Sequence, residues 1–496
     1  CTMTLSTLVL MIGAIALALT MLVKLVFKAD KSLLVSYFQN FCGALFIFSG
    51  WVKAIDPLGT AYKMEQYFAE FESTFEGTWM SFIAPMFPWL SEYAIGFSVF
   101  MIVFEIVLGV MLLIGARPKF TAWAFLSLVG FFTVLTGFTY LTGYVPQEVN
   151  FFEFGKWGPY VETNMKVTDC GCFGDFLKLK PKVSFFKDVF LMIPALMFVW
   201  KTKDMHELFG GKVRTGLVWG STALITLYCL SNFVWDLPHT DFRPFKKGAD
   251  VAEIKKKEEE IAANVKVIAY KLTNKESGEV TELPYAQFLK EYKNYPKEAW
   301  EYDQITSTPE SEPTKISDFA LTDLDGNDMT EEVLSDPSYS VMIVCYKFYY
   351  AQNSQTFTVQ DTTFVTDTVQ IDGTDSIQLV QRVGDIKTRQ VQKAVHLFDK
   401  DYVTPFNEKI TPFAEAAEAA GLKVYGVVGG AGSDIINDFR HETQSPYPFY
   451  EADDILLKTI VRSNPGVVLW KDGQIINKWH HKKLPTFEEV KAQDIQ

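Results

Sequence analysis

The sequence predicts an α-helical membrane bundle followed by a soluble α/β domain. Residues 1–235 of the 496-residue chain hold several apolar segments, each of the length that crosses a bilayer as a helix, about 20 residues. After residue 316, strand-like runs alternate with helical patterns, which predicts a partly parallel sheet. Residues 1–235 have 17 Lys and Arg against 16 Asp and Glu, whereas the remainder has 29 against 43. Such an acidic second half excludes nucleic acid as a partner, because phosphate binding needs clustered Lys and Arg.

Six transmembrane helices are predicted, and the lipid bilayer is therefore the first partner of the chain. Five are clear apolar segments, whereas the one that is fifth along the chain is weaker, because Lys187 and Asp188 interrupt its start. We expect these two side chains to lie at the membrane interface while residues 189–200 cross. The six predicted helices are residues 5–27, 33–54, 94–115, 120–144, 183–200 and 217–235.

Lys and Arg predict the orientation, because cytoplasmic loops are enriched in them. They occupy alternate connections, at Lys24, Lys28, Lys31, Arg117, Lys119, Lys201, Lys203, Lys212 and Arg214. Only the cluster Lys178, Lys180 and Lys182 disagrees. The prediction is a bacterial inner-membrane protein with both termini and residues 236–496 in the periplasm. Cys1 has two interpretations, a lipid-bearing mature start or a trimmed chain, and the second is favoured.

The second half begins with a stalk and ends in the α/β domain. Residues 239–315 contain a charged helix (246–262), a small hairpin (265–271 with 279–283) and a Ser/Thr/Pro/Glu-rich linker (306–314). Residues 316–496 include a buried strand at 339–348, and the insertion 351–391 is expected to form a β-hairpin. Before the two closing strands, Asn464-Pro465 is a candidate cis peptide bond.

This element order resembles the thioredoxin fold, in particular its TlpA-like and peroxiredoxin-like branch. The resemblance rests on the order of elements and on the segment IVRSNPGVVLWKDGQIINKW. It departs where the redox pair should follow the buried strand, because the sequence there is YKFYYAQNSQ and contains no CxxC. Cys345 lies within the strand and is expected to be a packed core residue. We therefore predict a domain without thiol chemistry that binds a periplasmic protein near Asn464 and Pro465, with the inserted hairpin over the vacated site.

The strongest chemical signal is the Cys170-Gly171-Cys172 motif, flanked by Asp169 and Asp175, before the fifth helix. A disulfide between cysteines so close forms only a tight ring, and strained disulfides are the labile, oxidising ones. Gly171 makes the ring feasible because glycine tolerates unusual backbone angles. The nearby lysines favour a thiolate and the two aspartates oppose it. Three interpretations stay open: a redox-active dithiol, a structural disulfide, and half of a metal site.

Three segments, taken in order, resemble the DoxX/MauE family of four-helix membrane proteins, in particular its Bacteroidota-type members with a thioredoxin-like C-terminal domain. These segments are FCGALFIFSGWVKAIDPLGTAYKMEQYF, FEIVLGVMLLIGARPKFTAWAFLSLVGFFTVLT and VTDCGCFGD. The resemblance implies a four-helix unit at residues 33–202, with residues 1–32 and 203–238 as additional transmembrane helices. It also implies redox chemistry linked to quinone, and the sequence shows no metal, flavin or haem motif.

Glu105 lies in the middle of the third predicted helix, where an acid is costly and usually functional or paired. It has two interpretations of equal weight: a proton relay to a bound quinone, and a carboxyl group that joins helices, either protonated or paired with Lys53. Lys53 and Asp56 are in turn predicted to form an interfacial ion pair at the outer end of the second helix.

Three functions fit these features. The first is a quinone-linked thiol-disulfide oxidoreductase that uses Cys170 and Cys172. The second is a non-enzymatic envelope scaffold that docks a partner through residues 316–496. The third is an accessory subunit of a sulfur-compound:quinone oxidoreductase, which only the family resemblance suggests.

Overall fold

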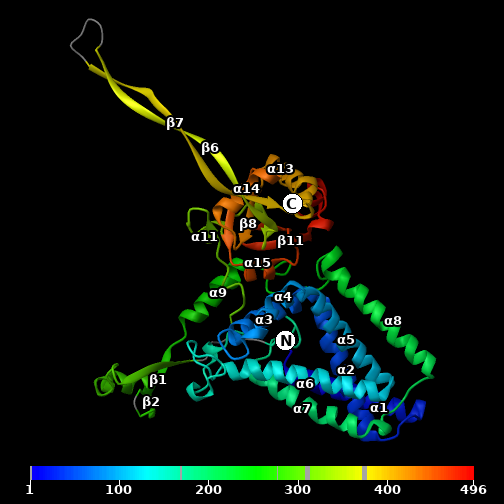
Figure 1. Ribbon diagram of the computed structural model, residues 1–496. Coiled ribbons are helices and arrows are strands. Elements are labelled where there is room, and N and C mark those ends of the chain that lie inside the picture. The colour runs from blue at the N-terminus through cyan, green and yellow to red at the C-terminus, as the bar shows by residue number, and fades with distance from the viewer. Residues whose placement is uncertain (1–2, 168–169, 276, 308–312, 371–376, 496) are drawn as a thin grey trace. The chain divides into compact units, whose positions relative to one another are not determined.

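The computed structural model describes the whole chain apart from residues 1–2, 168–169, 276, 308–312, 371–376 and 496 (Figure 1). It divides into two compact units, Cys1–Lys246 and Lys247–Gln496. The boundary between them falls within residues 239–315, the predicted stalk.

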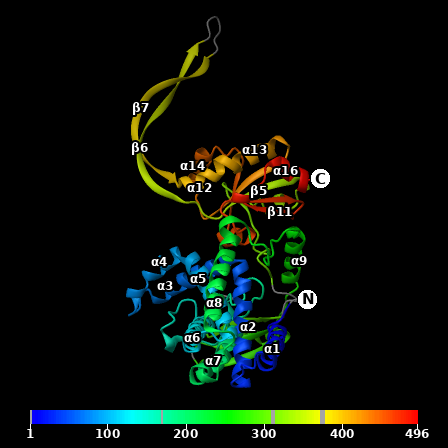
Figure 2. The same ribbon diagram turned by 90° about the vertical axis from the view of Figure 1, so that its right-hand side faces the viewer.

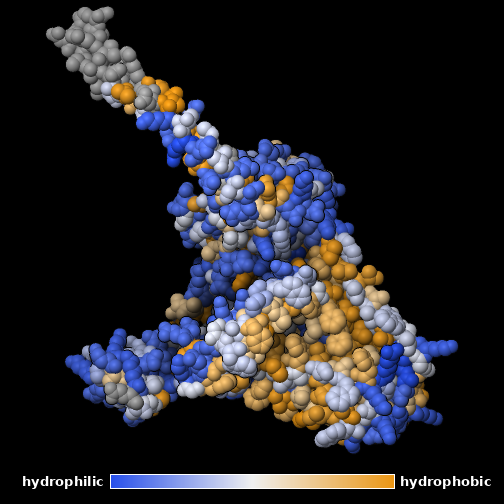
Figure 3. Space-filling model, viewed as in Figure 1, coloured by the Kyte–Doolittle hydropathy of each residue, from blue (hydrophilic) through white to orange (hydrophobic). Residues whose placement is uncertain are grey.

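In the first unit, six helices are long and apolar enough to cross a membrane, which confirms the predicted bundle. Figure 3 shows a largely apolar surface on this unit, in contrast to the hydrophilic surface of the second. The fifth crossing helix contains Lys187 and Asp188 within its length; Asp188 is only 1 % exposed, and Lys187 is half-buried. The six helices are α1 with η1 (Leu5–Phe27), α2 (Leu33–Ile55), α5 (Ala94–Ile114), α6 (Pro118–Thr142), α7 (Pro181–Trp200) and α8 with η6 (Gly211–Trp235).

Shorter elements fill two of the connections. Between α2 and α5 lie α3 (Pro57–Phe75), η2 (Ser81–Ile83) and α4 (Met86–Glu92). Helix α3 begins where the Asp56 carboxylate accepts a hydrogen bond from the Gly59 main chain at 3.1 Å, followed by Pro57 at the first helical position. Between α6 and α7 lie η3 (Phe154–Lys156) and η4 (Glu162–Asn164), followed by the Cys170-Gly171-Cys172 motif.

Polar contacts distinguish the two ends of the bundle. At one end Gln39, near the start of α2, donates to the main-chain oxygens of Leu112 and His206 at 2.9 and 3.2 Å. At the other end Asn232, near the end of α8, donates to the main-chain oxygen of Ala54 at 2.9 Å. Helices α2 and α5 therefore run in opposite directions, and the connection that contains α3 lies at the second end.

Glycines bring α2 and α5 close together. A Cβ atom at Gly109 would lie 2.8 Å from the main-chain oxygen of Gly43, and one at Gly50 would lie 2.4 Å from a carbon of Ile106. Small residues at such positions let helix backbones approach inside a membrane.

The second unit begins on the edge of its main sheet. The main chain of residues 248–251 exchanges hydrogen bonds with Gly473 and Ile475, and Val251 is fully buried. The predicted charged helix follows as α9 (Val251–Ala263). The predicted small hairpin is present as β1 (Val267–Asn274) and β2 (Val280–Pro284). The sequence did not predict helix α10 (Tyr285–Glu291), η7 (Tyr292–Asn294) or the strand β3 (Trp300–Thr306), which pairs with β1 to complete a three-stranded sheet.

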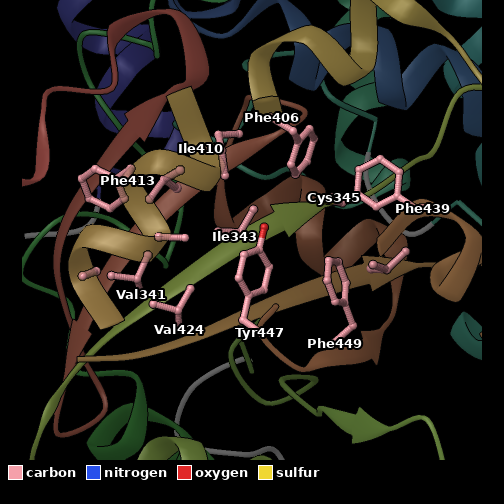
Figure 4. Close-up of a cluster of buried hydrophobic side chains, with 14 of the residues drawn as sticks. Val341, Ile343, Cys345, Phe406, Ile410, Phe413, Val424, Phe439, Tyr447 and Phe449 are labelled. Carbon is pink, nitrogen blue, oxygen red and sulfur yellow. The ribbon is translucent and has the colours of Figure 1, made fainter. Parts of the chain in front are cut away.

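A six-stranded mixed sheet forms the centre of the α/β domain, in the order β11-β10-β5-β8-β9-β4. Strands β5, β8 and β9 are parallel, and β10, β11 and β4 run antiparallel to their neighbours. Figure 4 shows the core on one face of this sheet, where Ile343 and Cys345 of β5 meet Phe406, Phe439 and Tyr447. The strands are β4 (Thr322–Asp323), β5 (Tyr339–Cys345), β8 (Lys423–Gly429), β9 (Phe449–Ala452), β10 (Gly466–Lys471) and β11 (Gln474–His480). The helices are α11 (Thr330–Leu334), α12 (Lys400–Pro405), η8 (Phe406–Ile410), α13 (Thr411–Ala419), α14 (Ser433–Thr443), α15 (Asp454–Ile460), η9 (His481–Lys483) and α16 (Phe487–Asp494).

The insertion forms the predicted hairpin, from β6 (Tyr350–Gln370) and β7 (Ile377–Phe398), although residues 371–376 lie outside the described part. We call this hairpin the β-arm. Its expected place over the domain is wrong: the β-arm projects away from the sheet (Figures 1 and 2). Its base is anchored by the ring of Phe398 at 5.1 Å from that of Phe439 and by His396, which hydrogen-bonds to Asp438 at 2.8 Å. Beyond this base, the described side chains of both strands are mostly exposed and make no core.

The close approach of α2 and α5 predicts that Gly109→Ala destabilises the bundle by about 1–3 kcal/mol, the usual effect of overpacking. Gly130→Ala in α6 is the matched control, because a Cβ atom there meets nothing within 4 Å. Thermal unfolding of the purified protein in detergent micelles measures both variants. Equal unfolding temperatures for the two would contradict the tight packing.

Candidate functional site

The cysteine motif lies in a short ordered loop that packs on α2. The Ser49 hydroxyl of α2 donates to the main-chain oxygen of Cys172 at 2.8 Å. Phe173 is buried and forms an antiparallel bridge with Leu177, while its ring lies 6.3 Å from that of Phe48. Phe173 therefore anchors the loop in the apolar interior of the bundle and fixes the two thiols beside the helices.

Gly171 has the unusual backbone angle that the sequence led us to expect, with φ of +60°. A Cβ atom there would also lie 3.2 Å from Cγ of Lys63 in α3. A side chain at this position would thus be strained by the backbone and crowded by α3. The loop needs glycine between its two cysteines.

Cys170 lies against a tyrosine. Its side chain is 8 % exposed and is hydrogen-bonded to the Tyr67 hydroxyl of α3. The hydroxyl of Thr139, near the end of α6, lies 3.3 Å from the same phenol oxygen. Burial raises the pKa of Tyr67 well above its ordinary value, and the two nearby cysteines raise it further. Tyr67 is therefore a neutral hydrogen-bond donor to this sulfur.

Cys172 has a different environment and is partly exposed. Burial of the thiol raises its pKa above the ordinary value, an effect that the positive charges of Lys187 and Lys53 oppose and the negative charge of Asp188 reinforces. The Ser184 hydroxyl also lies beside this thiol and favours its ionised form. The two sulfurs are thus chemically distinct although one residue separates them, and none of the five cysteines in the described part of the chain forms a disulfide.

Beside Cys172 lies a cluster of four charged side chains, which we call the charge cluster: Lys53, Glu105, Lys187 and Asp188. Lys53 of α2 forms an ion pair with Glu105 of α5, and Lys187 forms an ion pair with Asp188. Thr136 of α6 donates to the Asp188 carboxylate at 3.0 Å. Two positive and two negative charges give a formal net charge of zero, which suits a buried site.

The sequence-predicted residues are distributed as follows. Lys53 pairs with Glu105, as the helix-joining interpretation expected, whereas the Asp56 carboxylate caps α3. Asp175 lies 3.9 Å from Lys178, an exposed contact, and Asp169 lies outside the described residues.

The sequence missed the cations that act on Cys172. We expected surface lysines before α7, but the positive charges that affect this thiol come from Lys187 and Lys53, inside the bundle. A signal was present, because Ser184 and Asp188 are four residues apart and so share one helix face. No sequence pattern indicated Tyr67, because α3 is brought to the cysteine loop only by the tertiary fold. Within the ranges that the structure describes, no three His, Cys, Asp or Glu side chains form a group that could hold a metal ion.

In the second unit, the Asn464–Pro465 peptide bond is cis. The Asn464 amide donates to the main-chain oxygen of Lys347 at 2.6 Å and accepts from the Tyr402 hydroxyl at 3.3 Å. This loop therefore packs against the segment that follows β5, the expected place of a redox pair.

Aromatic side chains occupy that place. The ring of Phe348 stacks on Phe439 with centroids 4.3 Å apart. Cys345 is fully buried, and burial raises its pKa to about 12, although the adjacent Tyr402 hydroxyl lowers it. Cys345 is thus a packed core thiol without nucleophilic character.

Comparison with protein-family models, with curated proteins and with solved structures finds no match to this chain. The function must therefore be argued from the site itself.

The Lys53–Glu105 ion pair yields a stability prediction. Glu105→Gln leaves a buried positive charge without its partner, which we expect to destabilise the protein by about 3–5 kcal/mol. The double variant Lys53→Met with Glu105→Leu removes both charges and should regain most of that loss. Glu92→Gln, at an exposed position, is the control. Thermal unfolding in detergent micelles measures all three, and a single variant as stable as the control would show that the pair does not hold α2 to α5.

Proposed function

We propose that this chain is a membrane thiol-disulfide redox protein that passes electrons from thiols of exported proteins to membrane quinone through Cys170 and Cys172. One observation carries the proposal: two thiols lie together in a glycine-centred loop, one against a buried phenol and the other against a charge cluster in the bundle. Perturbed ionisable groups gathered around nucleophilic side chains are typical of functional sites.

The chemistry balances with a quinone as the electron acceptor. Two thiols of an exported protein reduce the Cys170–Cys172 disulfide by exchange, so the substrate gains a disulfide and the loop gains two thiols. Reoxidation of the loop releases two electrons and two protons, and quinone takes up both to become quinol. Titratable side chains beside Cys172 suit a reaction that moves protons with electrons. The resemblance to the DoxX/MauE family supports quinone as the acceptor.

The proposed orientation places the cysteines on the periplasmic side of a bacterial inner membrane. Six crossings put the α2–α5 connection, the α6–α7 connection and the chain after α8 on one side. Contacts within the first unit agree, because Tyr67 of α3 meets both Cys170 and Thr139. The Lys- and Arg-rich connections belong to the opposite side, which is cytoplasmic by the distribution of positive charge.

In this proposal, the second unit is a thioredoxin-like docking module that holds the exported partner. The order of its strands and helices and the cis Asn464–Pro465 bond support the likeness. Its single cysteine, Cys345, is buried in the core, so the proposed thiol exchange belongs to the membrane unit.

The double variant Cys170→Ser with Cys172→Ser tests the redox function. Reduced wild-type protein in liposomes that contain a quinone should lose two thiols per chain and form one quinol, whereas the double variant should form none. Alkylation of the remaining thiols, read by mass spectrometry, and quinol absorbance measure the two sides of the reaction. Cys345→Ser is the matched control and should behave as wild type. Equal quinol formation by the double variant would refute the proposal.

A second candidate function, an envelope scaffold, is favoured by the β-arm. A two-stranded ribbon is marginally stable alone in water, and its free edges invite pairing. Several apolar side chains on it are exposed: Val359, Phe364, Val365, Val383, Ile386 and Leu397. A scaffold would use this arm, and not the cysteines, to hold its partner.

Replacing residues 353–395 by a short Gly/Ser turn distinguishes the two functions. The scaffold predicts that a protein partner co-purifying with the full chain is lost with the β-arm and retained in the Cys170→Ser, Cys172→Ser variant. Quantitative mass spectrometry of the purified complexes gives the measurement. Retention of the partner without the β-arm would exclude the arm as its docking site.

A further inference from the structure

We propose that Cys172 forms the mixed disulfide with the substrate and that Lys187 is the positioning residue that stabilises its thiolate, while Cys170 is the second sulfur, held by Tyr67. This assignment rests on the proposed function. It adds the division of labour between the two sulfurs and a role for a lysine buried in a membrane helix.

Access distinguishes the sulfurs first. Cys172 is partly exposed, whereas Cys170 is buried beneath Tyr67. A protein substrate must bring its own sulfur into contact with the one it attacks, and Cys172 is the less buried of the two residues. Cys170 can still reach Cys172, because Gly171 with its positive φ permits a tight turn between them.

Charge distinguishes them next. The groups that face Cys172 come from three helices packed against the loop: Ser184, Lys187 and Asp188 from α7, Lys53 from α2, and the neutral Tyr67 from α3. Among the charges that act on this thiol, Lys187 has the largest effect. Glu105 of α5 acts on Lys187 in turn, and Thr136 of α6 is bonded to Asp188. A thiolate at Cys172 gives the cluster and the thiol together a formal charge of −1, and Lys187 is the cation that favours this thiolate most.

The exchange then proceeds in two balanced steps. A substrate thiolate attacks Cys172 in the Cys170–Cys172 disulfide, so a substrate–Cys172 disulfide forms and Cys170 leaves as a thiolate, which accepts the hydrogen bond of the Tyr67 hydroxyl. The second substrate thiolate attacks the substrate sulfur, its own disulfide forms, and Cys172 leaves as a thiolate beside Lys187. The two protons lost by the substrate thiols finally reside on Cys170 and Cys172.

The test follows the alkylation of Cys172 by iodoacetamide in the full-length, reduced Cys170→Ser protein in detergent micelles. Rates are measured from pH 6 to 10, and peptide mass spectrometry separates Cys172 from the other cysteines. Lys187→Met should move the midpoint of the pH profile upward and slow alkylation at pH 8 by about tenfold, the change that one unit of pKa gives. Lys187→Arg should retain most of the wild-type rate, and Lys182→Met, exposed on the same helix, should leave it unchanged.

A second variant keeps the test decisive if Lys187→Met folds poorly. Asp188→Asn removes the negative charge that opposes the thiolate, so alkylation of Cys172 should become faster, the opposite sign to Lys187→Met. A merely structural role of the ion pair predicts no such opposition. In the Cys172→Ser protein, Cys170 should react more slowly than Cys172 does in the Cys170→Ser protein.

An unchanged pH profile in Lys187→Met, slower alkylation in Asp188→Asn, or faster reaction of Cys170 would each overturn the assignment. None of these measurements involves quinone. Failure of the wild-type protein to reduce quinone would therefore refute the redox proposal separately, and the ionisation of Cys172 would still report on Lys187.

Discussion

The packing of the membrane unit depends on the pairing of charged side chains in the interior of the helix bundle. Lys53, Glu105, Lys187 and Asp188 come from three helices that are apolar enough to cross a membrane, and their two ion pairs leave no net formal charge. An isolated charge at that depth is costly, so each of these side chains is tolerated only while its partner is in place. Lys53–Glu105 thereby fixes α2 against α5, and the bond from Thr136 to Asp188 fixes α6 against α7. The polar cluster specifies helix partners in a way that the apolar surfaces alone do not.

The cysteine loop takes its properties from that cluster. Ser49 of α2 donates a hydrogen bond to the Cys172 main chain, and Lys53 follows one helical turn later. The residue that positions the loop, Ser49, therefore lies on the same helix face as the cation Lys53. On the other side, α7 supplies Ser184, Lys187 and Asp188 to the same thiol. Cys170, by contrast, meets Tyr67, a neutral donor. The bundle therefore gives two neighbouring cysteines unlike electrostatic surroundings, which is what a directional exchange between them needs.

Sequence patterns predicted those elements of the molecule that depend on the residues of a short, continuous segment. Apolar length alone identified the six crossing helices, and short apolar runs between helical patterns identified most strands of the six-stranded sheet. The errors concern tertiary partners. The burial of Asp188 beside Lys187 and Thr136 was not predicted, because hydropathy counts a charge as unfavourable and the contact with Thr136 lies outside any local window. Tyr67 was missed for the same reason, and the strand β3 because its apolar residues are few and half-exposed. The β-arm was identified as a hairpin from its composition, but its direction depends on the anchors Phe398 and His396 at its base.

In the proposed function, thiol exchange belongs to the membrane unit and partner binding to the second unit, because the two units place their cysteines in different surroundings. An exchange reaction needs an accessible sulfur that can ionise, and Cys345 is neither accessible nor ionised near neutral pH, since burial raises its pKa to about 12. The loop around the cis Asn464–Pro465 bond faces a segment filled by aromatic rings, so it offers main-chain and ring surfaces and no thiol. A partner held there would have to bring its own thiols to Cys172. Binding and electron transfer would then be separable by mutation, because the side chains that perform them belong to different units of the same chain.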